Sequence, residues 1–370
     1  MTLIESTVAA IEPQDRSARA AAHARLEQLT MPYWALGRLL DLAEELAGMT
    51  GTTRPPVARK TIATMVADHG VAAEGVSAYP QEVTVQMVAN FVHGGAGINA
   101  LAGQAGARVV IVDTGVAAEL AGPEWKTVVS RRIAAGSSNM AQGPAMTREQ
   151  AVRAVEVGIE LAGELGASTD VFGTGDMGIA NTTPSSAIIA CLTGSPVAEV
   201  TGRGTGIDDA ALRHKIDVVE RSLAVNRPDA DDALDVLAKV GGFEIGGLAG
   251  LILGAAAQRK PVVIDGVITA AAALVARGLC PAAADYLIAS HRSVEPGHRA
   301  ALAALGKEPL LDLGFRLGEG TGAALAMNVV EAAARVLTEV ATFEEAAVSH
   351  VDDAYEAGEP AVDQGTPEDA

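Results

Sequence analysis

Residues 313–322, which read Leu-Gly-Phe-Arg-Leu-Gly-Glu-Gly-Thr-Gly, place one guanidinium and one carboxylate among four glycines. This stretch follows a predicted strand over residues 309–313 and precedes a long apolar segment that predicts a helix from about Ala323. In open parallel sheets, the ligand crevice lies where strands end and helices begin. Glycines at such a turn let the backbone approach a ligand closely. Arg316 and Glu319 are therefore the first candidates for chemistry.

Glu319 has two interpretations. As a structural residue, it would complement the dipole of the helix that follows it. As a catalytic residue, it would be a carboxylate whose pKa is raised in an apolar pocket, where it can act as a base. Its glycine neighbours favour catalysis, because they leave the side chain little reason to be there for packing.

A second glycine-rich turn, residues 173–178, follows a predicted strand and leads toward a predicted helix. Thr183 is a suitable N-cap for that helix. Capping does not explain Asp176, Asn181 and Thr182, which are clustered ahead of it. Because backbone N–H groups at a helix N-terminus bind anions, this cluster predicts a site for a phosphate or a carboxylate.

A third glycine-rich turn, residues 201–206, also precedes a predicted helix, and Lys215 lies further along that helix. A capped helix with a solvated Arg203 and a solvated Lys215 would explain this pattern. Alternatively, the N–H groups of the turn and one of these cations hold an anionic group. His291, which follows Ser290 at the end of another predicted strand, is the best-placed histidine of the chain.

Two glycine patterns imitate a dinucleotide-binding fingerprint. The first contains Gly95 and Gly97 and needs a strand before them, but residues 86–93 are as plausibly helical. It also needs Asp113 to end the next strand. The second, at residues 173–178, has no acidic residue at the required distance. A Rossmann-type NAD-dependent oxidoreductase is therefore one rival interpretation, and a non-catalytic nucleotide-binding protein is another.

The net charge of −19 argues against non-specific binding to nucleic acid or to an anionic membrane. A phosphate ester would need local positive groups, and Arg203, Lys215 and Arg316 are the candidates. The spacing of cysteines and histidines resembles no zinc site, so we expect no metal. The first residues lack a basic region followed by an apolar core, which predicts a soluble, cytoplasmic protein.

Short apolar runs alternate with helical stretches from about residue 57, which predicts an α/β fold with a large, Rossmann-like parallel sheet flanked by helices. We expect this catalytic domain to span residues 61–322. Residues 1–60 and 323–345 are predicted to form a small helical domain from both ends of the chain. Residues 346–370 are acidic and poor in apolar residues, which predicts a disordered tail. The predicted strands cover residues 108–113, 169–173, 261–266, 285–291 and 309–313.

Five motifs, in this combination and order, resemble the nicotinate-nucleotide:dimethylbenzimidazole phosphoribosyltransferase family. The resemblance runs from about Arg54 to Phe343, which is nearly the whole chain. The combination is specific, although each glycine motif alone is not. The motifs lie at residues 76–84, 175–184, 201–206, 242–245 and 316–322.

The resemblance implies transfer of 5-phosphoribosyl from nicotinate mononucleotide to a nitrogen of 5,6-dimethylbenzimidazole. The products would be nicotinate and α-ribazole 5′-phosphate, which supplies the lower ligand of cobalamin. It also implies inversion of the anomeric carbon by direct displacement, Glu319 as general base, a homodimer, and no metal or organic cofactor. The residues predicted to bind substrate are Tyr79, Gln86, Met87, Asp176, Met177, Gly178, Asn181, Thr182, Gly202, Arg203, Gly204, Thr205, Lys215, Ser290, His291, Arg316 and Leu317.

The sequence departs from the family pattern in two places. Asp176 stands where many members carry Glu, which moves the carboxylate back by one methylene. Tyr79, Met87 and Met177 are bulkier or more apolar than the Ser, Gln and Leu common in enteric members. Both departures concern the base that is accepted, and they leave adenine and phenolic bases open as alternatives to a benzimidazole.

Overall fold

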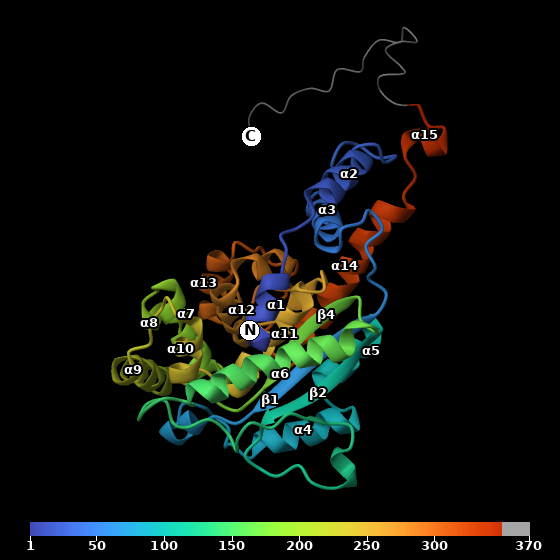
Figure 1. The fold of residues 1–370 in the computed structure, drawn as a ribbon. Coiled ribbons are helices and arrows are strands. Elements are labelled where there is room, and N and C mark those ends of the chain that lie inside the picture. Colours follow the sequence, from blue (N-terminus) through green and yellow to red (C-terminus); the bar gives the residue numbers. More distant parts are fainter. Residues whose placement is uncertain (350–370) are drawn as a thin grey trace.

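Six parallel strands form one sheet in the computed structural model, which describes residues 1–349 (Figure 1). The strand order is β3-β2-β1-β4-β5-β6, so the chain winds outward on one side from β1 and then on the other from β4. The predicted α/β fold is confirmed. The point where the direction of winding reverses lies between β1 and β4, which is where such sheets open a ligand crevice. The strands are β1 (Lys60–Ala67), β2 (Ala107–Gly115), β3 (Val129–Ser130), β4 (Val171–Met177), β5 (Val262–Ile264) and β6 (Leu287–Ala289).

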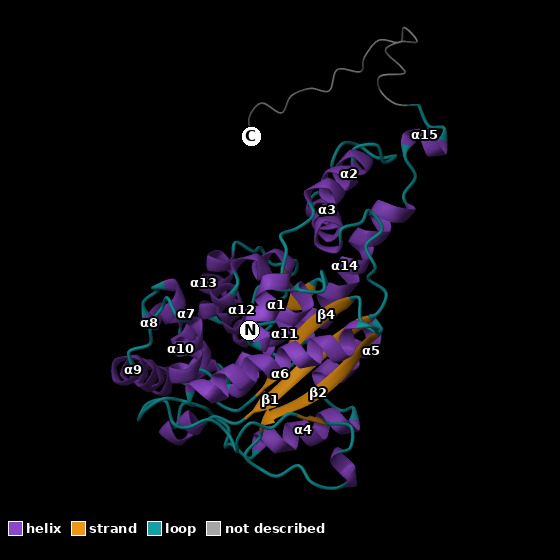
Figure 2. Ribbon diagram, viewed as in Figure 1, coloured by secondary structure: helices purple, strands orange, loops and turns teal. Residues whose placement is uncertain are grey.

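Helices cover both faces of this sheet (Figure 2). They are α1 (Leu3–Ala10), α2 (Arg16–Leu26), α3 (Arg38–Thr50), α4 (Val83–His93), α5 (Gly97–Ala105), α6 (Arg148–Gly166), α7 (Thr182–Thr193), α8 (Val197–Val200), α9 (Asp209–Asn226), α10 (Ala233–Val240), α11 (Phe243–Ala256), α12 (Val267–Leu279), α13 (Pro296–Leu305), α14 (Thr321–Glu339) and α15 (Phe343–Ala346). Short 3-10 helices lie at Gly70–Glu74, Pro123–Trp125 and Pro281–Tyr286. No helix among the described residues combines the length and the apolar character needed to cross a membrane.

The strand predictions miss β1 and the two-residue edge strand β3, and they include one strand that does not form. Central strand β1 is missing from them because Lys60, Thr61 and Thr64 interrupt its apolar run, yet every residue of β1 is buried. Their polar atoms have partners from distant segments, such as the Lys60 Nζ bond to Glu331 at 2.5 Å. The predicted strand at residues 309–313 is only an isolated bridge between His291 and Leu311.

Close contact between α6 and α11 depends on glycine. A β-carbon on Gly158 of α6 would lie 1.9 Å from the carbonyl oxygen of Gly247 in α11, and one on Gly250 would lie 1.8 Å from that of Val155. The two helices can therefore approach backbone to backbone. On the other face of the sheet, α14 lies over Gly173 of β4.

Helices α2 and α3 pack together and against α14, at a distance from the sheet (Figure 1). Arg25 of α2 donates from Nε to the Leu337 carbonyl at 2.9 Å, which ties the two ends of the chain together. We propose that these helices form the predicted small domain. Helix α1 does not belong with them, because it packs against α6 of the sheet domain. Ile4 of α1 is buried. Of the predicted tail, residues 350–370 lie outside the described residues.

Candidate active site

A cavity of about 570 Å³ is lined by the carboxyl end of β4 and by the loops that follow β1, β5 and β6. Its wall is built from loops that are far apart in the sequence, as expected for the crevice of a doubly wound sheet. The predicted site residues on this wall are Tyr79, Met87, Asp176, Met177, Gly178, Asn181, Thr182, Gly204, Thr205, Arg316, Leu317 and Glu319. Unpredicted residues on the same wall include Ser77, Gly266, Ser293 and Glu295.

Glu319 lies in the turn that leads into α14. Its φ of +64° is in the left-handed region, and its neighbours Gly318 and Gly320 also have positive φ. Left-handed backbone at a residue other than glycine is strained and must be held by its surroundings. Two strands hold it: Thr64 of β1 donates its hydroxyl to the Glu319 carbonyl at 3.0 Å, and Gly175 of β4 leaves room for that carbonyl.

The Glu319 side chain is 5% exposed and faces the start of α5. Its Oε2 atom accepts the Ile98 N–H at 3.1 Å. Burial raises the pKa of Glu319 above its ordinary value, while the N–H groups of Ile98 and Gly97 act in the opposite direction. A nearly buried carboxylate with few partners can accept a proton from a ligand in the cavity.

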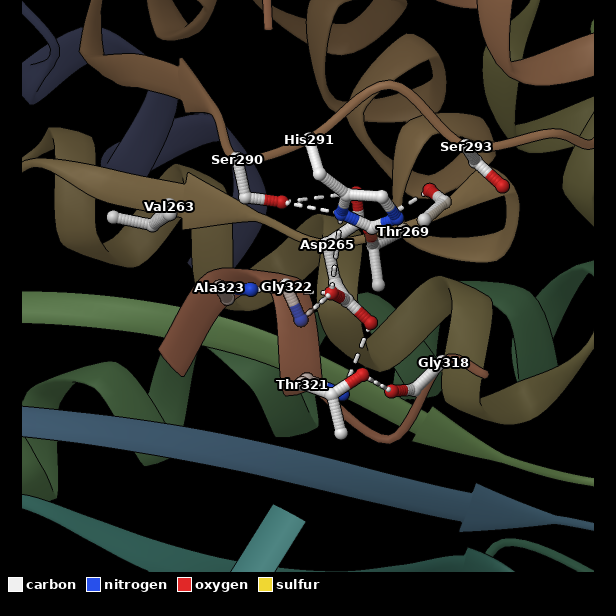
Figure 3. A network of polar contacts seen from close by, with 12 residues as sticks. Val263, Asp265, Thr269, Ser290, His291, Ser293, Gly318, Thr321, Gly322 and Ala323 are labelled. Carbon is white, nitrogen blue, oxygen red and sulfur yellow. Dashed lines mark hydrogen bonds and ion pairs between the residues drawn. The ribbon is translucent and has the colours of Figure 1, made fainter. Parts of the chain in front are cut away.

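Asp265, just after β5, fastens the first turn of α14 (Figure 3). Its carboxylate accepts the N–H groups of Gly320, Gly322 and Ala323 at 3.0, 2.7 and 3.1 Å. Burial raises the pKa of Asp265 to about 7 despite these bonds. Asp265 thus positions the turn that carries Glu319. It was not among the predicted site residues, although an Asp at the end of a predicted strand was visible in the sequence.

Asp176 is the second buried carboxyl of the cavity. Its Oδ2 atom accepts Asn181 Nδ2 at 2.9 Å, whereas Oδ1 has no partner. Burial, with the nearby charge of Asp265, raises the pKa of Asp176 well above its ordinary value. Asp176 therefore retains a proton to a higher pH than an exposed carboxyl does.

The prediction that Thr183 caps the next helix was wrong, because Asn181 is the N-cap of α7 and Thr183 lies inside that helix.

Lys215 is completely buried behind this wall. Its ammonium donates to Thr182 Oγ1 at 2.7 Å and to the Gly202 carbonyl at 3.2 Å. Burial lowers the pKa of Lys215 to about 8. Gly204, which lines the cavity, adopts φ +52°, and a β-carbon there would lie 3.3 Å from Lys215 Nζ. The structure therefore brings together the start of α7, which follows the second glycine-rich turn, and the third glycine-rich turn around one ammonium.

The other two predicted cations, Arg203 and Arg316, point to different surroundings. Arg203 is exposed and pairs with Asp209, and it also donates to the Ile207 carbonyl at 2.9 Å. Arg316 lines the cavity and donates to the Gly204 carbonyl at 3.2 Å. Arg316 is therefore available to an anion in the cavity, whereas Arg203 is turned toward its own helix.

Apolar side chains line another part of the cavity. Tyr79 and Leu317 are 55% and 61% exposed, and Met87 and Met177 lie with them on the wall. Exposed apolar side chains around a concave site are typical of a binding site for a flat, apolar ring. Gln86 is exposed on α4 and is not part of this wall.

Ser290 and His291 are buried below the cavity rather than on its wall. Ser290 Oγ lies 3.0 Å from His291 Nδ1, and a β-carbon on Gly322 would lie 2.0 Å from that nitrogen. Burial lowers the pKa of His291 to about 4. The pair thus packs against the start of α14 (Figure 3).

The glycines at positions 95 and 97 do not form a dinucleotide-binding turn. Residues before Gly95 form helix α4 (Val83–His93), so Gly95 and Gly97 join two helices rather than a strand and a helix. This removes the geometry that the NAD-dependent oxidoreductase interpretation requires.

Comparison with known proteins identifies the family. A model of the phosphoribosyltransferase family matches residues 11–348. The chain belongs to this family. A relative from Syntrophotalea carbinolica, named nicotinate-nucleotide–dimethylbenzimidazole phosphoribosyltransferase, is 65% identical over 94% of this chain and 99% of its own length. A relative of the same name from Desulfotalea psychrophila is 56% identical over the same shares.

A crystal structure of nicotinate-nucleotide–dimethylbenzimidazole phosphoribosyltransferase from Thermus thermophilus has the same fold. Its TM-score is 0.86 at 46% sequence identity, and the match covers 91% of this chain and 99% of that chain. The resemblance predicted from the five motifs is confirmed by these matches.

Proposed function

We propose that this phosphoribosyltransferase moves the 5-phosphoribosyl group of nicotinate mononucleotide to a nitrogen of 5,6-dimethylbenzimidazole. A ring nitrogen of the base attacks the anomeric carbon, and the bond from that carbon to the pyridinium nitrogen breaks. The bonding electron pair neutralises the pyridinium ring, which leaves as nicotinate. The other nitrogen of the base loses its proton, which gives α-ribazole 5′-phosphate for the nucleotide loop of cobalamin.

The observation that carries the chemical part of this proposal is the position of Glu319. Its carboxylate lies on the cavity wall above the β1–β4 reversal, with a raised pKa and an N–H partner at Ile98. We propose that it removes the proton from the base. Since loss of a cationic ring relieves charge, the displacement needs positioning and proton removal more than a covalent intermediate.

For the phosphate we propose the group formed by Lys215, Arg316 and the start of α7. Lys215 supplies a buried positive charge next to Thr182 and Gly204, and Arg316 reaches the same Gly204 from the other side. Helix N-termini add backbone donors for an anion. This local charge offsets the strongly acidic character of the chain, whose net charge is −19.

For the aromatic base we propose the slot of Tyr79, Met87, Met177 and Leu317. Large apolar side chains favour flat, hydrophobic rings and provide few hydrogen bonds to distinguish a benzimidazole from a purine. The choice of base therefore depends on how well the shape of the ring fits between these side chains.

Incubating the purified protein with nicotinate mononucleotide and a panel of benzimidazoles, purines and phenols tests the function. We expect release of nicotinate that requires an added base, fastest with 5,6-dimethylbenzimidazole. No release with any base would refute the proposal. The same samples, dialysed against a chelator, test the expectation that no metal is needed. Light scattering at several concentrations tests the proposed homodimer.

A further inference from the structure

Glu295 is a carboxylate on the cavity wall that the reaction outlined above does not use. It is the N-cap residue of α13, but its side chain makes no capping bond to its own helix. Instead, Oε1 accepts the Gly204 N–H at 2.9 Å. The side chain is 8% exposed, so this bond holds a nearly buried charge. Because this N-cap carboxylate does not bond to its own helix, it is free to hold the loop that contains Gly204.

Both peptide groups of Gly204 are held from outside its own loop. Glu295 accepts from its N–H, and Arg316 donates to its carbonyl at 3.2 Å. The loop also wraps closely around Glu295, since a β-carbon on Gly202 would lie 1.9 Å from Glu295 Oε2. The Gly202 carbonyl in turn accepts from the Lys215 ammonium. Glu295 thus contacts the loop over Lys215 at both Gly202 and Gly204.

Glu295 also faces Lys215 electrostatically. Helix α7, which packs against α9, carries no charged residue. The negative charge of Glu295 opposes the effect of burial, which lowers the pKa of Lys215 to about 8. Three charged side chains near α9 have partners of their own, since Arg203 pairs with Asp209, Arg221 with Glu74 and Lys239 with Asp235. Further charges around this helix are the exposed Asp217 and Glu220 of α9, Glu199 of the neighbouring α8, and Arg316 at the Gly204 carbonyl.

We propose that Glu295 is a positioning residue that fixes the Gly202–Gly204 loop over Lys215 and keeps the Lys215 ammonium charged for the phosphate. This role rests on the function proposed above, because it assigns the anion that Lys215 receives. Glu295 itself touches the loop and not the reacting atoms. It therefore acts on binding of nicotinate mononucleotide, and on the pH range in which binding occurs.

The test is the pH dependence of KM for nicotinate mononucleotide in wild type and Glu295→Gln. Glutamine can still accept the Gly204 N–H, but it lacks the charge. Without that charge the pKa of Lys215 falls, so the ammonium is lost at a lower pH. Wild-type KM should rise above about pH 8. In Glu295→Gln the rise should begin roughly one pH unit lower, the size expected of one nearby opposite charge.

Two further variants separate charge from shape. Glu295→Asp retains the charge but has a shorter side chain. KM should therefore increase at every pH, while the pH at which KM begins to rise should stay as in wild type. Asp217→Asn removes an equal charge from the exposed side of α9, two residues after Lys215, and should leave the profile in place. Thermal unfolding of each variant identifies any loss of fold.

Three results would overturn the role of Glu295: a Glu295→Gln profile that overlays wild type, a lower KM for Glu295→Gln at every pH, or an equal shift in Asp217→Asn. Failure of the proposed function looks different, because wild type itself would release no nicotinate. In that case the Kd for inorganic phosphate, measured by calorimetry across the same pH series, replaces KM. A shift confined to Glu295→Gln supports the inference, and its absence overturns it.

Discussion

The Glu319 carboxylate accepts the Ile98 N–H at 3.1 Å, at the first turn of α5. This contact joins a turn near the end of the chain to a helix more than two hundred residues earlier. The helix N-terminus favours the ionised carboxylate, and burial favours the protonated one. Because burial prevails, the pKa of Glu319 is raised, which suits a base that accepts a proton and later releases it.

Glu319→Gln should abolish most turnover while the substrates still bind. Removing a positioned general base costs about 100- to 10,000-fold in kcat. The amide oxygen can still accept the Ile98 N–H, so binding of nicotinate mononucleotide should change little. Single-turnover release of nicotinate and calorimetry measure the two quantities. In wild type, kcat/KM should fall as the pH is lowered through the raised pKa of Glu319, since the base must be ionised.

Asp176→Asn is the matched control for this variant, since it makes the same carboxyl-to-amide change in the same cavity. Asp176 retains its proton more readily than Glu319 because its pKa is raised well above the ordinary value. An amide has the same charge as a protonated carboxyl, which the raised pKa of Asp176 favours, so kcat should fall by no more than about tenfold. An equal loss in both variants would contradict the assignment of Glu319 as the base.

Lys215→Met should weaken nicotinate mononucleotide binding, and Arg203→Ala should not. Methionine retains the buried volume near Thr182 but removes the charge. Loss of a charge-assisted hydrogen bond costs about 1.5–3 kcal/mol, which is roughly a 10- to 100-fold increase in Kd. Arg203 is exposed and paired with Asp209, so its removal should change Kd little. Calorimetry of both variants decides which cation holds the phosphate.

Gly175→Ala should damage activity much more than Gly173→Ala on the same strand. A β-carbon on Gly175 would lie 2.2 Å from the Glu319 carbonyl oxygen, which is backbone and must move. A displacement of about 1 Å near a reacting group costs about 100-fold in rate. On Gly173 the β-carbon would meet the end of the Met327 side chain at 2.8 Å and the Ile62 side chain at 2.9 Å. Neither contact involves the backbone of the Glu319 turn, so kcat should be largely retained. Steady-state kinetics of the pair measure this difference.

Asp265→Asn should destabilise the protein, most strongly at acidic pH. Asn provides one acceptor oxygen and loses at least one of the bonds to Gly320, Gly322 and Ala323. The pKa of Asp265 is about 7 in the folded state and about 4 when unfolded. A raised carboxyl pKa stabilises the folded state below about pH 4, and this contribution is lost as the pH rises to about 7.

Urea unfolding of wild type and Asp265→Asn at pH 4, 5.5 and 7.5 measures this effect. The difference in unfolding free energy should narrow across the series, because only wild type loses the contribution of a protonated Asp265. A difference that widens with pH would show that the ionised carboxylate is the better cap. Kinetics at pH 7.5 should show reduced kcat as well, since the Glu319 turn is then held less firmly.

Several features were readable from the sequence because they depend on local patterns. Short apolar runs between helices predicted a parallel sheet, since a strand buried on both faces needs apolar residues throughout. A carboxylate among glycines directed attention to Glu319, because that combination rarely serves packing. The order of the five motifs indicated the family that the relatives confirm.

Other features depended on tertiary structure, because they arise from contacts between distant segments. The sequence of β1 looks too polar for a central strand, because the partner of Lys60, Glu331, is far away in the sequence. Arg203, Lys215 and Arg316 are equivalent as cations in the sequence, and only burial by α7 and the 201–206 turn distinguishes Lys215. Glu295 resembles an ordinary helix cap until the fold brings Gly204 to its carboxylate. Residue types and local periodicity therefore predicted the sheet and directed attention to Glu319, whereas desolvation and long-range hydrogen bonds distinguish Lys215 and Glu295 from the other charged residues.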